Sequence, residues 1–238
     1  MTYQQRESDD AIVLQLASGA AASSSVIWLH GLGADGYDFV PIVPELRLPE
    51  QCAPRFIFPH APIRAVTVNN GMRMRAWYDI LDFSPGAAED AAGISASAAI
   101  ADRYIARERE AGIAANRIVL AGFSQGGAIA LHAGLRQTEP LAGILALSTY
   151  LPLRAMLSEA PMACREVPIL MCHGQADPIL PMALGEASRD LLRRTGCRVE
   201  WKEYPMQHQV CAAEIADIST WLFRVLGTAG ADPKPGPA

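Results

Sequence analysis

Residues 122–126 read Gly-Phe-Ser-Gln-Gly and fit the G-x-S-x-G pattern of a serine nucleophile. The apolar run 117–121 before them is typical of a buried strand, and apolar residues recur at helical spacing after the serine. A serine on such a sharp turn needs glycine neighbours, because side chains at 122 and 126 would collide with the adjoining strand and helix. Ser124 is therefore predicted to start a helix, where free N–H groups favour developing negative charge.

A serine hydroxyl needs a general base, and the base needs an acid that holds its tautomer. In α/β hydrolases the chain order is serine, acid, histidine. His208, which follows the last predicted strand, fits the base, and Asp177, at the end of another strand, fits the acid. Two simpler roles stay open, in which Asp177 caps a helix beginning near Pro181 and His208 caps the final helix. Together with the sharp turn at 122–126, called the elbow from here on, the triad of Ser124, Asp177 and His208 is the stronger interpretation.

The same chemistry needs two N–H donors for an oxyanion, usually one after the nucleophile and one from an early loop. Gln125 supplies the first. The glycine-rich segment 30–36 is predicted to supply the second through the backbone N–H of Leu32. Taken alone, this segment is equally consistent with an ordinary turn. It lacks the Lys-Ser/Thr pair of a phosphate-binding P-loop.

Composition narrows the class of protein. The chain has 238 residues, of which 50% are hydrophobic and 19% charged, with a net charge of −5, so general nucleic-acid binding is not expected. Residues 1–10 are polar and no apolar run is long enough to span a bilayer, which predicts a cytoplasmic protein without a transmembrane segment. The five cysteines are scattered and suggest neither disulfides nor a metal site. The sequence leaves open whether the protein forms a homodimer.

The apolar pattern predicts one α/β domain over 1–226 with a mostly parallel sheet, followed by a flexible Gly/Pro-rich tail at 227–238. Segment 69–89 breaks the alternation and is predicted to be an irregular wall or cap. Strands are expected at 11–16, 26–29, 55–58, 117–121, 143–147, 169–172 and 199–204, and helices at 39–46, 94–110, 124–137, 181–194 and 210–226.

Across nearly the whole domain the chain resembles the bacterial carboxylesterases of the phospholipase/carboxylesterase group, which are related to acyl-protein thioesterases. The resemblance rests on ordered segments at 30–36, 38–39, 41–44, 59–62, 76–80, 122–127, 147–148, 173–174 and 177–178. It implies an α/β-hydrolase fold with helices on both faces and a small or minimal cap. It also implies the triad and oxyanion donors named above, and structural roles for His30, His60 and His173.

The resemblance further places Trp77, Met74 and Ile179 near the nucleophile, as candidates for an apolar acyl pocket. Plain core packing explains these three residues equally well. One position departs from the family, which usually has glycine immediately before the catalytic histidine, where this chain has Gln207. If the loop keeps an angle suited to glycine, Gln207 costs about 1 kcal/mol or more and the His208 loop shifts.

The resulting expectation is a serine carboxylesterase that cleaves short- to medium-chain carboxylic esters through an acyl-enzyme, with no metal or cofactor. Its partner is a small-molecule or lipid-like ester. The same machinery would serve an acyl-protein thioesterase or a lysophospholipase. A non-catalytic binding protein on a hydrolase scaffold is the alternative from another class, and the intact triad residues argue against it.

Overall fold

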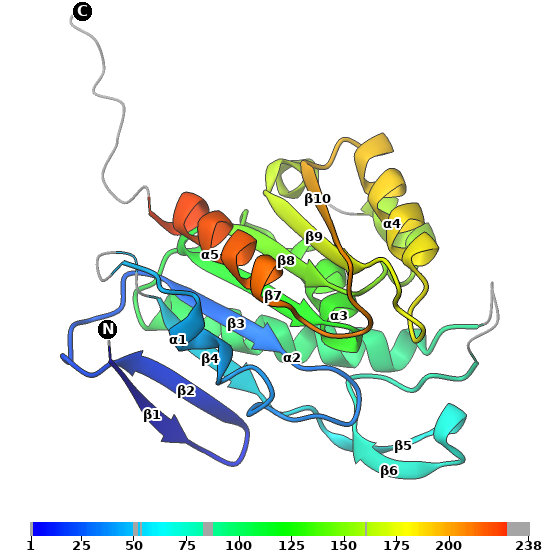
Figure 1. The fold of residues 1–238 in the computed structure, drawn as a ribbon, viewed down its shortest axis with the longest axis horizontal. Coiled ribbons are helices and arrows are strands. Elements are labelled where there is room, and N and C mark those ends of the chain that lie inside the picture. The colour runs from blue at the N-terminus through cyan, green and yellow to red at the C-terminus, as the bar shows by residue number, and fades with distance from the viewer. Residues whose placement is uncertain (1, 50–51, 53, 83–87, 160, 228–238) are drawn as a thin grey trace, which may run out of the picture.

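An eight-stranded sheet forms the centre of the computed structural model, which describes residues 2–49, 52, 54–82, 88–159 and 161–227 (Figure 1). The strand order is β1-β2-β4-β3-β7-β8-β9-β10. From β4 to β10 neighbouring strands are parallel, whereas β1 and β2 form an antiparallel edge. The strands are β1 (Tyr3–Glu7), β2 (Ala11–Leu16), β3 (Ser25–Leu29), β4 (Arg55–Pro59), β7 (Ile118–Phe123), β8 (Gly143–Leu147), β9 (Ile169–Gly174) and β10 (Val199–Tyr204).

Helices cover both faces of this sheet (Figure 1). One apolar core contains residues of α1 (Ile42–Glu45) and α5 (Ala212–Leu226), and the other contains residues of α2 (Ala91–Glu110), α3 (Gln125–Gly134) and α4 (Met182–Arg194). Within β7, Leu120 belongs to one core and Val119 to the other, because successive strand residues point to opposite faces. Burial on both faces explains the continuous apolar runs. Short 3₁₀ helices are Thr67–Asn69, Ala115–Arg117, Arg154–Glu159 and Met162–Glu166.

The predicted α/β-hydrolase fold is confirmed, and β2, β8 and β10 have the predicted bounds. The helix predicted over 39–46 is shorter. Its first part forms turns in which N–H groups bond three residues back, as Ile42 does to Phe39. Pro41 and Pro44 have no N–H donor for the regular helical pattern, so only Ile42–Glu45 is helical. No helix within the described ranges is both long and apolar enough to cross a membrane.

Two strand pairings were not predicted. β1 carries the sequence Tyr-Gln-Gln-Arg-Glu, which has no apolar pattern, and it forms because it pairs with β2 along its length. The segment predicted as irregular contains β6 (Met72–Arg75), which pairs antiparallel with β5 (Ile63–Val66) as a separate hairpin (Figure 1). Residues 83–87 of that segment, and the predicted tail beyond Gly227, lie outside the described residues.

Glu214, in the first turn of α5, is a carboxyl group inside the core. Its side chain is completely buried, and among the described residues neither oxygen has a hydrogen-bond partner of normal geometry. Burial raises the pKa of this carboxyl to about 8, and the Cys211 backbone and the Cys172 thiol offset only part of that effect. Glu214 is therefore protonated in the folded protein at neutral pH.

This burial predicts that the protein loses stability as the pH rises. Below about pH 4.5, Glu214 is protonated in both states, and between there and pH 8 only the folded state keeps the proton. The free energy of unfolding should fall across that window by at most about 5 kcal/mol. Glu214→Gln should remove the fall, so that denaturant unfolding shows a variant more stable than wild type at pH 9. Glu45→Gln, on exposed surface, is the control; a Glu214→Gln variant with the wild-type pH slope would contradict the assignment.

Candidate active site

Ser124 occupies a strained turn between β7 and α3. Its backbone has φ 52° and ψ −118°, a region that residues with side chains rarely adopt. Two neighbours hold it there: the Ser124 N–H donates to the Leu147 carbonyl at 2.8 Å, and the Thr149 hydroxyl donates to the Ser124 carbonyl at 2.7 Å. Although Ser124 is the N-terminal capping residue of α3, its hydroxyl makes no capping hydrogen bond. The hydroxyl is therefore not committed to the helix end.

The glycines flanking Ser124 are required by close backbone contacts. A Cβ atom at Gly122 would overlap the backbone of Gly126, and a Cβ atom at Gly126 would overlap the carbonyl of Leu29 on β3. No side-chain rotation relieves such a clash, because the opposing atoms are backbone. The elbow geometry expected from the sequence is present.

Asp177 and His208 meet across the loops that follow β9 and β10. Nδ1 of His208 lies 2.6 Å from Oδ2 of Asp177, and the Asp177 side chain has no exposed surface. Since a carboxylate accepts, Nδ1 carries the proton and Nε2 keeps its lone pair. The other oxygen, Oδ1, accepts the N–H groups of Ile179 and Leu180 at 2.9 and 2.8 Å. Asp177 thus presents one oxygen to the imidazole and is fixed through the other.

The simpler capping roles for these two residues are wrong. The N-terminal capping residue of α4 is Pro181, and that of α5 is Cys211; neither helix has a side-chain capping bond. Neither Asp177 nor His208 therefore caps a helix, and capping does not account for the contact between them.

The loop before His208 lies tightly against the end of β9. A Cβ atom at Gly174 would overlap the carbonyls of Met206 and Gln207, and the N–H of Ala176 donates to the Met206 carbonyl at 3.1 Å. Gln207 is not among the non-glycine residues of the described chain that have positive φ. The strain expected at this position is therefore absent, and the close approach is provided by a glycine on the facing strand.

Three segments converge at the elbow. The rings of Phe123 and His208 lie with centroids 4.8 Å apart, which places the histidine beside the residue preceding Ser124. From the other side, a Cβ atom at Gly31 would lie 3.2 Å from the Phe123 ring and 3.7 Å from Cβ of Ser124. Leu32, the predicted oxyanion donor, follows Gly31 directly. The structure thus brings segment 30–36, the elbow and the His208 loop together.

The three predicted pocket residues have different environments. Trp77 is completely buried, and its indole N–H donates to the His30 carbonyl at 2.9 Å, so it packs in the core instead of offering open surface. Met74 is half-buried, with its sulfur 3.7 Å from the position of a Cβ atom at Gly33 in the predicted oxyanion loop. Ile179 is 60% exposed, two residues after Asp177.

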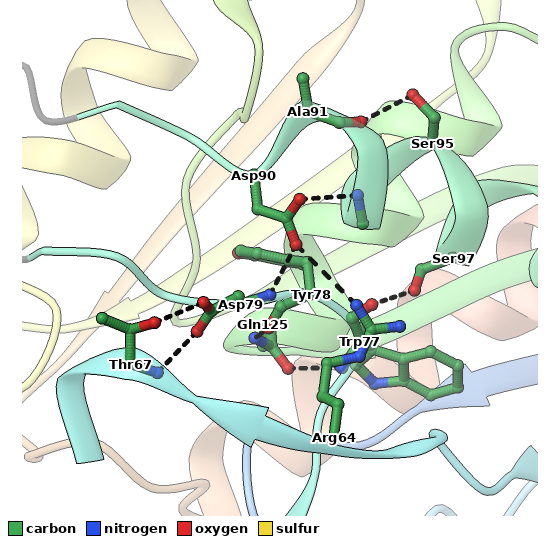
Figure 2. Close-up of polar contacts among 11 residues, drawn as sticks. Arg64, Thr67, Trp77, Tyr78, Asp79, Asp90, Ala91, Ser95, Ser97 and Gln125 are labelled. Carbon is green, nitrogen blue, oxygen red and sulfur yellow. Dashed lines mark hydrogen bonds and ion pairs between the residues drawn. The ribbon is translucent and has the colours of Figure 1, made fainter. Parts of the chain in front are cut away.

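The Gln125 side chain has a role that the sequence did not reveal. Its Oε1 accepts the Trp77 backbone N–H at 2.8 Å, and its Nε2 donates to the Tyr78 carbonyl at 2.7 Å (Figure 2). Asp90 accepts the backbone N–H of Asp79 at 2.9 Å. The two Gln125 bonds fix Trp77 and Tyr78 against the elbow, and the third bond joins the segment to the start of α2. No local pattern signals them, because 47 or 48 positions separate Gln125 from its partners.

The remaining buried histidines are neutral. Burial lowers the pKa of His30 and of His132 to about 4, and it also lowers the pKa of His173. Nε2 of His173 faces the Leu180 carbonyl at 2.8 Å, so it donates and supports the turn that follows Asp177. In the part of the chain that the structure describes, no group of three or more His, Cys, Asp or Glu side chains is placed to hold a metal ion.

Comparison with known proteins decides the family. The family described as Phospholipase/Carboxylesterase matches residues 13–226. The chain belongs to the phospholipase/carboxylesterase family. It is 41% identical over 213 residues to acyl-protein thioesterase 1 of Neurospora crassa, covering 85% of this chain and 87% of the relative. It is 38% identical over 214 residues to acyl-protein thioesterase 1 of Gibberella zeae, covering 86% and 91%.

A solved structure agrees with this assignment. The crystal structure of Zea mays acyl-protein thioesterase 2 superposes with a TM-score of 0.80 at 28% identity, covering 91% of this phospholipase/carboxylesterase family member and 99% of the maize chain. The family assignment makes the protein a hydrolase of the esterase and thioesterase type. The expectation of a specifically bacterial esterase is not supported, because the two relatives named above are fungal.

Proposed function

We propose that this protein is a serine acyl hydrolase in which Ser124 is the nucleophile, His208 the general base and Asp177 the acid. The observation that carries the proposal is the 2.6 Å contact between His208 Nδ1 and the buried Asp177 carboxylate, on a loop whose imidazole packs against Phe123 beside the serine. A histidine held in this tautomer directs a basic Nε2 away from the carboxylate. The hydroxyl of Ser124 at the strained elbow is its counterpart.

The reaction proceeds in two steps. Ser124 Oγ attacks the acyl carbonyl as His208 Nε2 takes its proton, and the oxyanion accepts the backbone N–H groups of Leu32 and Gln125. Collapse of the tetrahedral intermediate breaks the bond to the leaving thiol or alcohol, which receives the proton from His208. Water then attacks the acyl-enzyme with His208 again as base, releasing the carboxylic acid and restoring Ser124.

The leading substrate class is an S-acylated protein thioester. The 41% and 38% identical relatives are both named acyl-protein thioesterase 1, and each match spans most of both chains. Two apolar side chains would contact an acyl chain near the carbonyl. Ile179 is exposed and follows Asp177 by two residues, and Met74 is half-buried and lies close to Gly33.

Carboxylic esters of short or medium acyl chains are the second candidate, favoured by the family description itself, and lysophospholipids belong to the same chemistry. A thiol and an alcohol leave from analogous tetrahedral intermediates that differ only in the sulfur or oxygen of the leaving group, so the triad by itself accepts both. The preference for an acylated protein, a small ester or a lysophospholipid therefore depends on the surface that surrounds the triad.

A substrate profile separates these candidates. Purified protein should be assayed with an S-palmitoylated peptide, the matching O-palmitoyl serine peptide, p-nitrophenyl esters of increasing acyl length, and a lysophospholipid. We expect kcat/KM for the S-acyl peptide to exceed that for the O-acyl peptide by about 10-fold or more, or about 1.4 kcal/mol in barrier, because the more acidic thiol is the better leaving group and the two peptides are otherwise alike. A clear preference for p-nitrophenyl butyrate with no thioester cleavage would favour the carboxylesterase instead.

A further inference from the structure

The ring of His30 connects two separate segments of backbone near the elbow. It is 1% exposed, and its Nε2 lies 3.0 Å from the N–H of Ala61, so Nε2 accepts. In a neutral imidazole the other nitrogen must then carry the proton, and Nδ1 donates to the Gly31 carbonyl at 2.7 Å. Burial, which lowers the pKa of this imidazole to about 4, keeps the ring neutral.

The bond to Gly31 fixes the direction of the next N–H. The Gly31 carbonyl and the Leu32 N–H belong to one planar trans peptide, in which the two groups point in opposite directions. A peptide beside a glycine rotates easily unless something holds its carbonyl. The imidazole is the nearer of two donors to that carbonyl, at 2.7 Å against 3.3 Å for the Ala34 N–H, so it contributes most to where the Leu32 N–H points.

A second set of contacts fixes the His30 segment to the nucleophile. The His30 carbonyl accepts the indole N–H of Trp77, and the two rings lie with centroids 5.3 Å apart. The backbone N–H of Trp77 in turn bonds to the side chain of Gln125, the residue after Ser124 (Figure 2). On the far side of Leu32, the N–H of Gly33 donates to the Arg75 carbonyl at 2.9 Å. Both proposed oxyanion donors are therefore held by one continuous chain of bonds.

We propose that His30 is a positioning residue for the acyl-transfer reaction: its Nδ1–H orients the Gly31–Leu32 peptide so that the Leu32 N–H faces the oxyanion formed at Ser124. Trp77 and Gln125 hold that peptide at a fixed position relative to the elbow. The inference rests on the proposed function, because a donor has an oxyanion to meet only if Ser124 is the nucleophile. His30 touches neither substrate nor the reacting atoms.

Two substitutions of His30 each keep one of the two hydrogen bonds of the imidazole and remove the other. Asparagine places an amide N–H near the position of Nδ1 and keeps a donor for Gly31, whereas glutamine reaches the position of Nε2 and keeps an acceptor for Ala61. His30→Asn leaves the buried Ala61 N–H unpaired, whereas His30→Gln leaves the Gly31 carbonyl with the longer bond from the Ala34 N–H at 3.3 Å. Both variants should lose stability, and His30→Gln no more than His30→Asn. Only His30→Gln should release the Gly31–Leu32 peptide. We expect kcat to fall about 10- to 100-fold in His30→Gln with KM within about threefold, since complete loss of a donor costs about 10²–10³.

His30→Asn should keep kcat within about threefold of wild type, although thermal unfolding should give His30→Gln a midpoint no lower than that of His30→Asn. Equal losses of kcat in the two variants, or full kcat in His30→Gln, would overturn the proposal. If neither variant folds, Trp77→Phe decides, because it removes the indole N–H bond to the His30 carbonyl together with part of the buried ring. It should lower kcat about threefold to tenfold with little change in KM. An unchanged kcat in Trp77→Phe would then count against the proposal.

Ser124→Ala in the same assay separates this inference from the proposed function. If Ser124→Ala keeps its activity, the nucleophile assignment is wrong, and with it the role given to Leu32. If Ser124→Ala is inactive while His30→Gln keeps full kcat, the hydrolase assignment stands and only the role of His30 fails.

Discussion

Replacing Ser124 by alanine should lower kcat by about 10⁴-fold or more, because the residual rate then depends on the oxyanion donors and on binding alone. The change removes one oxygen and leaves the backbone contacts of the elbow to Leu147 and Thr149 in place. The measurement is initial-rate hydrolysis of a short p-nitrophenyl ester, together with labelling by a fluorophosphonate. Wild type should be labelled at Ser124, and the variant should remain unlabelled.

Ser148 provides a matched control. It also follows a strand of the same sheet and has a positive φ of 44°, but its hydroxyl is completely buried. Ser148→Ala should keep activity within about threefold, because this hydroxyl is not placed in the reaction. A Ser124→Ala variant that still hydrolyses the ester at more than a few per cent of the wild-type rate would rule out Ser124 as the nucleophile.

Replacing Asp177 by asparagine should lower kcat by about 10⁴-fold while preserving the fold. The amide oxygen can take the place of Oδ1 and keep accepting the N–H groups of Ile179 and Leu180. The amide NH₂ then faces His208 Nδ1 and donates to it, so the imidazole proton moves to Nε2. In that tautomer Nε2 has no lone pair with which to take the proton of Ser124.

The measurement is kcat of Asp177→Asn, together with its thermal unfolding midpoint, which should change little from wild type. Asp217→Asn is the control: an amide oxygen can still accept the Tyr204 hydroxyl, which bonds Asp217 at 2.8 Å, and only an exposed ion pair with Lys202 is lost. We expect this control to keep activity within about threefold. If Asp177→Asn keeps a tenth of the wild-type kcat, another group must orient His208.

Local patterns in the chain were enough to predict the strands and the turn that position the proposed triad. Residues 118–123 and 169–174 are strands buried on both faces, so their apolar runs are continuous and easy to recognise. The flanking glycines of Ser124 identify the turn, because no other residue fits the backbone contacts found there. The order of Ser124, Asp177 and His208 then selected one histidine from five.

Strands that form through pairing, without an apolar pattern of their own, were missed. β1 has no apolar alternation and forms only as the partner of β2. The β5–β6 hairpin has alternating arginines and methionines in β6, and its register is set by the facing strand. The interpretation of Gln207 failed for a related reason: the sequence marks a missing glycine, while the close approach is made possible by Gly174 on the neighbouring strand.

The sequence by itself determined the fold class, the family and the residue types of the proposed triad, because these depend on spacing along the chain and on small residues at fixed offsets. Only the tertiary structure decided how those residues are held: which nitrogen of His208 faces Asp177, that Trp77 lies inside the core, and that His30 bonds the peptide preceding the Leu32 N–H. Hydrogen-bond direction and burial depend on neighbours brought together by folding, and no local pattern encodes them.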